Sequence, residues 1–130
     1  MTKTGKKNDC PCGSEQVFDR CCNRFLSGQE APRTPLELMC SRYTAYTRQD
    51  SRYLRHTWYP NAMPEGALAA DPSIKWIRLH IIRHEEEGDD GLVEFIAHYK
   101  VNGRARKLHE TSRFLREGGK WYYLDGTFNE

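Results

Sequence analysis

The sequence predicts an α+β fold in which two or three helices are packed on a four-stranded antiparallel meander, preceded by a small zinc knuckle. Three observations predict it. Four of the five cysteines lie within residues 10–22, helical periodicity occupies residues 35–57, and four strand-like runs joined by short turns fill residues 74–128. The expected organisation is a knuckle and linker over residues 1–30 and an α+β domain over residues 31–130.

Composition limits the functions that are compatible with this fold. Lys and Arg total 20 against 18 Asp and Glu, and the resulting net charge of +2 is too balanced to predict nucleic-acid binding. No apolar run approaches the roughly 20 residues that span a bilayer, and the start "MTKTGKKNDC" lacks the apolar stretch of a secretory signal. We therefore expect a cytoplasmic protein with no membrane partner. In that reducing compartment, clustered cysteines favour metal binding over disulfides.

The first element is the stretch "CPCGSEQVFDRCC", which supplies Cys10, Cys12, Cys21 and Cys22. Pro11 fixes φ and Gly13 permits positive φ, so a tight turn can bring the first two thiols together. Ser14 is the expected N-cap of a short helical turn before the last two. Four thiolates complete a tetrahedral zinc shell, and we predict one structural Zn²⁺ on these four cysteines. A disulfide, a redox thiol site and an iron–sulfur cluster are the alternatives, whereas four thiolates leave no position for a catalytic water.

This stretch resembles the SEC-C motif, named for the C-terminal zinc tail of the protein-export ATPase SecA, whose usual form is C-P-C-G-S-G-K-K-(Y/F)-K-K-C-(C/H). The four cysteines fall on the ligand positions, and Gly13, Ser14 and Phe18 also match. The basic residues differ, because residues 15–17 are Glu-Gln-Val and residues 19–20 are Asp-Arg in place of lysines. The resemblance implies zinc binding, but it does not imply partner binding through basic side chains.

The next element is a helix with a clear start signal. Thr34 is followed by Pro35 and, three residues on, by Glu37, which is a capping box with proline at the first helical position. A helix is expected over residues 35–49. Its apolar stripe is predicted to consist of Leu36, Met39, Cys40, Tyr43 and Thr47. Cys40 is expected to be a buried, inert thiol, and a reactive thiol in a pocket is the alternative.

Shorter elements flank this helix. Residues 24–34 are predicted to form a linker. Asp50 is the expected cap of a second helix over residues 51–57, which must end before Pro60. A third brief turn is predicted from Met63 to Ala70, before the strands begin.

The four strands are expected at residues 74–84, 91–101, 104–117 and 120–128. Asn102-Gly103 and Gly118-Gly119 are two-residue hairpin signals, and "EEEGDDG" is a looser turn. Counting outward from these turns, Val101 pairs with Arg104, Tyr99 with Arg106, Phe95 with Glu110, Glu117 with Lys120, Phe114 with Tyr123, and Ser112 with Asp125. The inner face then carries Val93, Phe95, Ala97, Tyr99, Leu108, Phe114 and Tyr123, with Glu110, Ser112 and Asp125 among them.

Polar groups on the covered face of a sheet need partners. They could bond to the backbone or to a helix arginine for purely structural reasons, or they could line a ligand cleft between helices and sheet. The candidate pocket residues are Arg42, Tyr99, Glu110, Ser112, Tyr123 and Asp125. His80 and His84 stand four apart on a predicted strand, about 13 Å from each other and too far to share a metal. No catalytic residue is assigned.

The order of these elements resembles the nuclear-transport-factor-2-like fold, a cone with an internal pocket. The strings "SRYTAY", "SRFL" and "WYYLDG" downstream of the cysteines resemble the YchJ-like family of uncharacterised bacterial proteins. This resemblance implies an architecture and no established activity. The leading hypothesis is a zinc-binding adaptor whose knuckle contacts a protein partner. The alternatives are a small-molecule-binding module that uses the cone, or an enzyme with an acid–base pair such as Glu110 and Asp125.

Overall fold

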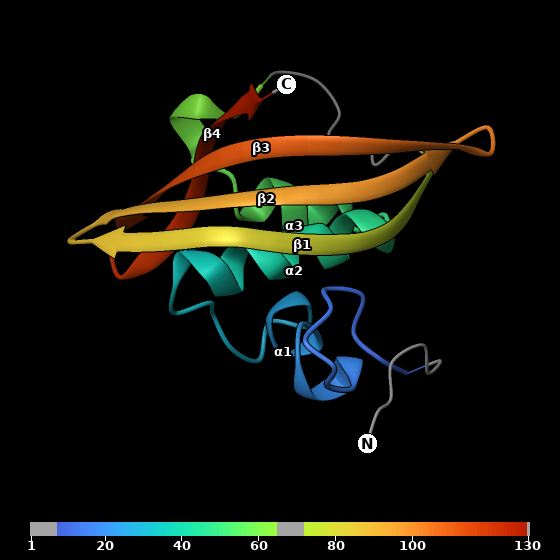
Figure 1. Cartoon of the computed structure of the whole chain (residues 1–130). Coiled ribbons are helices and arrows are strands. Elements are labelled where there is room, and N and C mark those ends of the chain that lie inside the picture. The colour runs from blue at the N-terminus through green and yellow to red at the C-terminus, as the bar shows by residue number, and fades with distance from the viewer. Residues whose placement is uncertain (1–7, 65–71, 130) are drawn as a thin grey trace.

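The computed structural model describes residues 8–64 and 72–129 and confirms the predicted α+β architecture. The helical elements are η1 (Phe18–Arg20), α1 (Asn23–Leu26), α2 (Pro35–Thr47), α3 (Ser51–His56) and η2 (Pro60–Ala62). The strands are β1 (Ile74–Glu87), β2 (Asp90–Val101), β3 (Arg104–Glu117) and β4 (Lys120–Asn129), paired as an antiparallel meander in the order β1-β2-β3-β4. α2 and α3 lie against one face of this curved sheet, with the cysteine-rich segment on the far side of α2 (Figure 1).

The helix boundaries follow the predicted caps. Thr34 Oγ1 accepts a hydrogen bond from Glu37 N at 3.1 Å, and Asp50 Oδ1 accepts one from Tyr53 N at 3.0 Å. α2 ends two residues earlier than predicted because Gln49 adopts a positive φ of 57°. The predicted turn from Met63 to Ala70 falls largely on residues 65–71, which lie outside the described residues.

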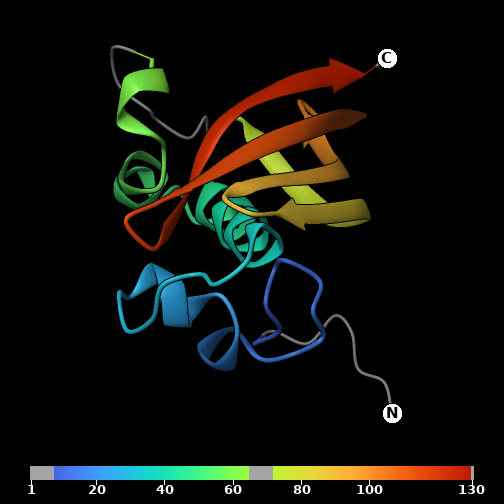
Figure 2. The same ribbon diagram turned by 90° about the vertical axis from the view of Figure 1, so that its left-hand side faces the viewer.

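α2 is buried on more sides than the single predicted stripe accounts for. Leu38, Met39 and Tyr43 pack against the sheet in one cluster, which also contains Val93, Phe95, Ala97, Phe114 and Trp121. On the other side of the helix, Ala45 is 0% exposed and packs into a second cluster around the cysteines. The helix therefore lies between the sheet and the knuckle (Figure 2).

The predicted linker over residues 24–34 is partly wrong. Its first residues belong to α1, and Phe25 and Leu26 are only 5% and 8% exposed within the cysteine cluster. Gly28, with a φ of 88°, follows this short helix and lets the chain reverse. The apolar pair in "RFLSG" was the available signal, because two adjacent large apolar residues are costly to expose.

The strand register that was counted outward from the two hairpin turns is confirmed as far as a β-bulge in β4. Phe95 pairs with Glu110 and Phe114 with Tyr123, as counted from the turns. The register then shifts between Arg113 and Phe114, so Arg113 faces Asp125 and Ser112 faces Gly126. The predicted pairing of Ser112 with Asp125 is wrong, because one extra residue in β4 turns every later side chain to the other face.

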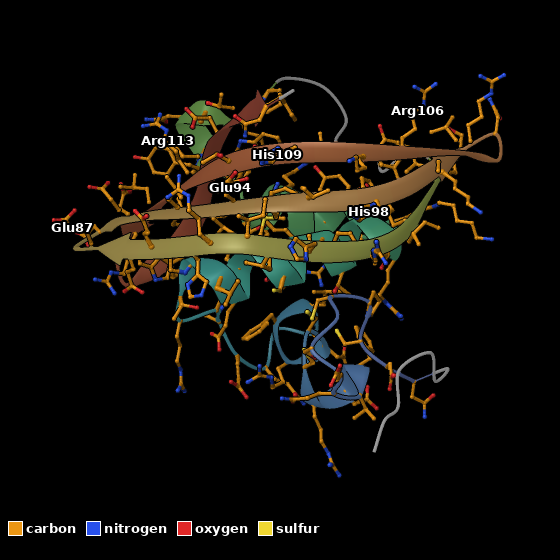
Figure 3. All side chains as sticks on the ribbon, in the orientation of Figure 1. Glu87, Glu94, His98, Arg106, His109 and Arg113 are labelled. Carbon is orange, nitrogen blue, oxygen red and sulfur yellow. The ribbon has the colours of Figure 1, made fainter. Side chains whose placement is uncertain are left out.

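The outer face of the sheet is charged. Figure 3 shows Glu94, His98, His109 and Arg113 on the side away from the helices. Glu94 accepts hydrogen bonds from Arg83 at 2.8 Å and from His109 Nε2 at 2.7 Å. None of the helices in the described ranges is long and apolar enough to cross a membrane.

Candidate metal centre and cavity

The sulfur atoms of Cys10, Cys12, Cys21 and Cys22 lie within 4.8 Å of one another, and each residue is at most 9% exposed. The Sγ atoms of Cys12 and Cys21 are 3.6 Å apart. Four thiolates around one ion with metal–sulfur bonds of about 2.3 Å stand about 3.8 Å from each other in a tetrahedron. The spacing therefore fits a single tetrahedral metal ion. All five cysteines lie in the described part of the chain, and none forms a disulfide there.

A short backbone hairpin positions the first two cysteines. Cys10 N donates to Gln16 O at 2.8 Å, and Gly13, with a φ of 88°, donates from its N to Cys10 O at 3.2 Å. Ser14 does not cap a helix as expected, since its hydroxyl accepts from Gln16 N at 3.2 Å and lies 3.1 Å from Cys21 Sγ. The helical turn is confined to η1, directly before the last two cysteines.

Electrostatics favour a cation at the centre of this cluster. Hydrogen bonds from Cys10, Cys22 and Cys40 lower the pKa of Cys12. Burial raises the pKa of Cys21 to about 11, and hydrogen bonding to Cys10 and Cys12 together with burial raises that of Cys22. Without a metal, one thiolate is thus stabilised by its neighbours' protons. A divalent cation would allow the remaining thiols to ionise as well, because it supplies the compensating charge.

α2 contacts the cluster through residues four apart. Thr44 Oγ1 lies 3.8 Å from Cys10 Sγ, and the Arg48 guanidinium lies 4.3 Å from the centroid of the Phe18 ring. Cys40, one turn earlier, packs against the same cluster, and hydrogen bonding to Cys12 with burial raises its pKa. Cys40 is therefore partly buried beside the four-cysteine cluster, and not fully buried as predicted. This second buried face of α2 was not predicted from the sequence, although residues 40, 44 and 48 are four apart and therefore lie on one side of a helix.

A cavity of about 270 Å³ lies between α2 and the inner face of the sheet. Four of the six predicted pocket residues line it, namely Arg42, Glu110, Ser112 and Tyr123. Its other walls are mostly aromatic and include Tyr43, Tyr46, Trp58, Phe95, Leu108 and Phe128. These aromatic side chains were not assigned to a binding site from the sequence, because aromatic residues at such spacing are equally typical of an ordinary core.

Arg42 is 3% exposed at the base of this cavity. Its Nη1 donates to Leu54 O at 2.8 Å and to Thr57 Oγ1 at 2.7 Å, which ties α2 to α3. Its guanidinium lies 5.0 Å from the ring centroid of Trp58 and 4.5 Å from that of Tyr123. Burial lowers the pKa of Arg42, but a guanidinium stays charged in proteins.

Glu110 is the acidic group of the cavity and is 7% exposed. Its Oε2 accepts hydrogen bonds from Ser112 Oγ at 2.8 Å and from Tyr123 Oη at 2.9 Å. Gly126 lies against this carboxylate, and a Cβ at that position would collide with it. Burial and the Glu110 charge raise the pKa of Tyr123, so its hydroxyl keeps the proton that it donates.

The other two predicted pocket residues lie elsewhere. Asp125 is on the outer face, where Arg113 donates to both of its oxygens at 2.7 and 2.6 Å and lowers its pKa. Tyr99 packs on Trp76, with ring centroids 5.3 Å apart, and does not line this cavity. Glu110 and Asp125 are therefore on opposite faces and do not form an acid–base pair.

Comparison with known proteins matches residues 34–126 to the family described as "YchJ, middle NTF2-like domain". A UPF0225 protein of Ralstonia nicotianae is 43% identical over 129 residues, covering 90% of this chain and 89% of that protein. A UPF0225 protein of Cupriavidus metallidurans is 44% identical, covering 100% and 99% of the two chains.

Two solved structures are similar to the chain. The solution structure of a SEC-C motif containing protein from Rhodopseudomonas palustris aligns with a TM-score of 0.83 at 30% identity, covering 93% of this chain and 98% of that one. A crystal structure of a SEC-C motif containing protein from Psychrobacter arcticus aligns with a TM-score of 0.72 at 23% identity, covering 93% and 82%, and shows the shared fold.

Proposed function

The chain belongs to the YchJ-like family with a nuclear-transport-factor-2-like domain, also called UPF0225, and on that premise we propose that it is a cytoplasmic zinc-binding adaptor. In this proposal Cys10, Cys12, Cys21 and Cys22 hold one structural Zn²⁺. The knuckle of residues 1–30 contacts a protein partner, and the α+β domain of residues 31–130 is its scaffold. The start of the family match at residue 34 supports this boundary.

The observation that carries the proposal is the closed set of four buried sulfur atoms within 4.8 Å of one another. Four protein thiolates fill a tetrahedral shell and leave no position for a reacting water, so the metal's role is structural. Tetrahedral sulfur ligation is typical of zinc or of iron–sulfur centres. The two are distinguished by metal analysis and by visible absorption, which a zinc protein lacks.

The surface that the knuckle presents supports a protein partner. Val17 is 37% exposed and lines a surface groove of about 420 Å³ together with Asp9, Asp19 and Arg48. Single exposed apolar residues are common on protein surfaces, so the support comes from the groove, which places Val17 among charged groups that a partner could contact. A complementary partner segment would offer an apolar side chain flanked by a basic group, which could reach the two aspartates.

Purified chain should contain one zinc per molecule, and Cys12→Ser should contain none. Val17→Asp should keep its zinc but lose the partner that wild type retains in a pull-down. Ile82→Asp is the matched control, since Ile82 is 42% exposed on the sheet edge, away from the groove. If Cys12→Ser binds a full equivalent of zinc, or if Val17→Asp and Cys12→Ser both keep every partner, the proposal fails.

A further inference from the structure

We propose that the cavity between α2 and the sheet binds a small aromatic zwitterion, of which an α-amino acid with an aromatic side chain is the simplest form. The site is separate from the cysteine knuckle, so the inference goes beyond the adaptor function. It depends on Arg42, Glu110 and the aromatic walls around them.

Arg42 is buried and has donors that no group among the described residues satisfies. It forms no ion pair with any residue in the described ranges, although it is 3% exposed. Both of its hydrogen bonds there come from Nη1. The remaining donors, on Nε and Nη2, form the fork that receives a carboxylate through two parallel hydrogen bonds.

These donors reach the cavity rather than packed protein. Among residues 8–64 and 72–129, Trp58 Nε1 is the one fully buried side-chain nitrogen or oxygen without a hydrogen-bond partner. The unbonded nitrogens of Arg42 therefore touch accessible space, and the cavity is the space that Arg42 lines. Trp58 lines it too, but its Nε1 is fully buried and does not reach this accessible space, and a buried donor without a partner is rare.

Glu110 places the opposite charge in the same cavity. Its Oε2 is occupied by Ser112 and Tyr123, while Oε1 makes no hydrogen bond within the described residues. Tyr123 stands between the two charges, since its ring faces Arg42 and its hydroxyl bonds to Glu110. A complementary ligand therefore has an anionic group that binds the Arg42 guanidinium and a cationic hydrogen-bond donor that binds the free Glu110 oxygen. A zwitterion supplies both, and a ligand with a single charge leaves one buried group unpaired.

The size of the cavity and its aromatic walls fit a small aromatic ligand. A cavity of about 270 Å³ holds the volume of roughly nine waters, which corresponds to a ligand of about ten to fifteen non-hydrogen atoms. Tyr43, Tyr46, Trp58 and Phe95 present aromatic surface to such a ligand. Phe128 is 65% exposed at the rim, where a ligand could enter.

A purely structural role explains only part of this arrangement. It accounts for Arg42 Nη1, which joins α2 to α3, and for Glu110 Oε2, which is satisfied by two hydroxyls. It leaves the guanidinium fork, Oε1 and Trp58 Nε1 without partners. The guanidinium fork and Oε1 touch accessible space, where a ligand or water can satisfy them, and Trp58 Nε1 is the one fully buried group without a partner in the described ranges.

The test is a titration of the ¹⁵N-labelled, metal-loaded full chain, followed by amide spectra. L-Phenylalanine, L-tyrosine and L-tryptophan are added up to about 10 mM, alongside 3-phenylpropionate and phenethylamine, which each carry one of the two charges. We expect saturable shifts for at least one amino acid at α2, Trp58 and β3. Each single-charge analogue should bind at least about tenfold more weakly. Absence of saturable shifts there, or equal affinity for the analogues, would overturn the proposal.

Two variants make the test specific to the cavity. Leu108→Trp fills it and should abolish the shifts, whereas Leu92→Trp, on the outer face beside Glu85 and Arg113, should leave them unchanged. Glu110→Gln keeps the side-chain shape but removes the negative charge. It should therefore reduce the preference for the amino acid over phenylpropionate to less than about threefold. Unchanged binding in Leu108→Trp, or an unchanged preference in Glu110→Gln, would overturn the assignment.

Discussion

The knuckle and the sheet share α2 but are held together by different forces. On the sheet side, Leu38, Val93 and Phe114 are at most 2% exposed and form an apolar core of the ordinary kind. On the knuckle side, four of the nine buried members of the cluster are cysteines, whose apolar surface is small. Burial of apolar area stabilises the first region, and under the proposed function the free energy of metal binding would stabilise the second.

This difference indicates which part of the protein depends on the metal for its structure. The helix face that carries Thr44 and Ala45 is covered by the knuckle, while the face that carries Leu38 and Tyr43 is covered by strands. Loss of the metal therefore uncovers one side of α2 and leaves the other packed.

Removal of the metal should unfold the knuckle and spare the sheet. Structural zinc contributes about 10–16 kcal/mol to small zinc folds, far more than the remaining contacts of residues 8–26 can replace. Amide spectra recorded with and without a chelator should show the signals of residues 8–26 moving to random-coil chemical shifts. The signals of β2 and β3 should stay dispersed. Simultaneous loss of the β2 and β3 signals would show instead that the chain is one cooperative unit.

The reverse experiment weakens the sheet and leaves the metal ligands intact. Phe114 is 2% exposed in the sheet core, and Phe114→Ala should lower the free energy of unfolding by about 3–5 kcal/mol. Denaturant unfolding measures this change, and the folded fraction should still bind one metal. Phe128→Ala is the matched control, because Phe128 is 65% exposed and should cost less than about 1 kcal/mol. Equal costs for the two variants would contradict the assigned core.

The contact between the regions can be tested at Thr44, whose hydroxyl lies 3.8 Å from Cys10 Sγ. Thr44→Val keeps the shape and removes this polar neighbour of a ligand, which typically lowers metal affinity about tenfold or more. Competition with a chromophoric chelator measures the affinity. The control is Thr47→Val, because the Thr47 hydroxyl donates to the backbone of Thr44 and not to sulfur. Identical affinities for wild type and Thr44→Val would show that this hydroxyl does not contribute to metal binding.

How much of this could be read from the sequence differs between the regions. The capping box at Thr34 and the hairpins at Asn102-Gly103 and Gly118-Gly119 act through neighbouring residues, and they placed α2 and the strands correctly. The cysteine grouping was also predicted, since its ligand types and spacing are local. The knuckle's packing on α2 was not, because contact between distant segments leaves only a weak periodic trace at positions 40, 44 and 48.

The candidate cavity shows the same limit. Arg42, Glu110, Ser112 and Tyr123 were correctly grouped because the register holds as far as Phe114 and Tyr123. Asp125 was misplaced by a single bulge. Gly126, which lies against the Glu110 carboxylate, was the one nearby signal, since a strand glycine often marks a bulge or a close approach.

The smallest effect concerns the outer face, where Asp125 pairs with Arg113. Hydrogen bonds from Arg113 lower the pKa of Asp125 in the folded chain. The pair's contribution is therefore complete above the unfolded pKa of about 3.9 and is lost as the pH falls through the folded value. Both side chains are more than half exposed, so solvent screening limits the contribution to about 0.5 kcal/mol.

A double-mutant cycle with Asp125→Asn and Arg113→Gln, measured by denaturant unfolding at pH 7 and pH 3, checks this value. The coupling energy should be about 0.5 kcal/mol or less at pH 7 and should be smaller at pH 3, where Asp125 is partly protonated. A coupling above about 1.5 kcal/mol would mean that surface charge, and not apolar burial, makes a major contribution to the sheet. The contrast with the knuckle would then change, because acid protonates thiolates and releases a metal, and both regions would be acid-sensitive instead of one.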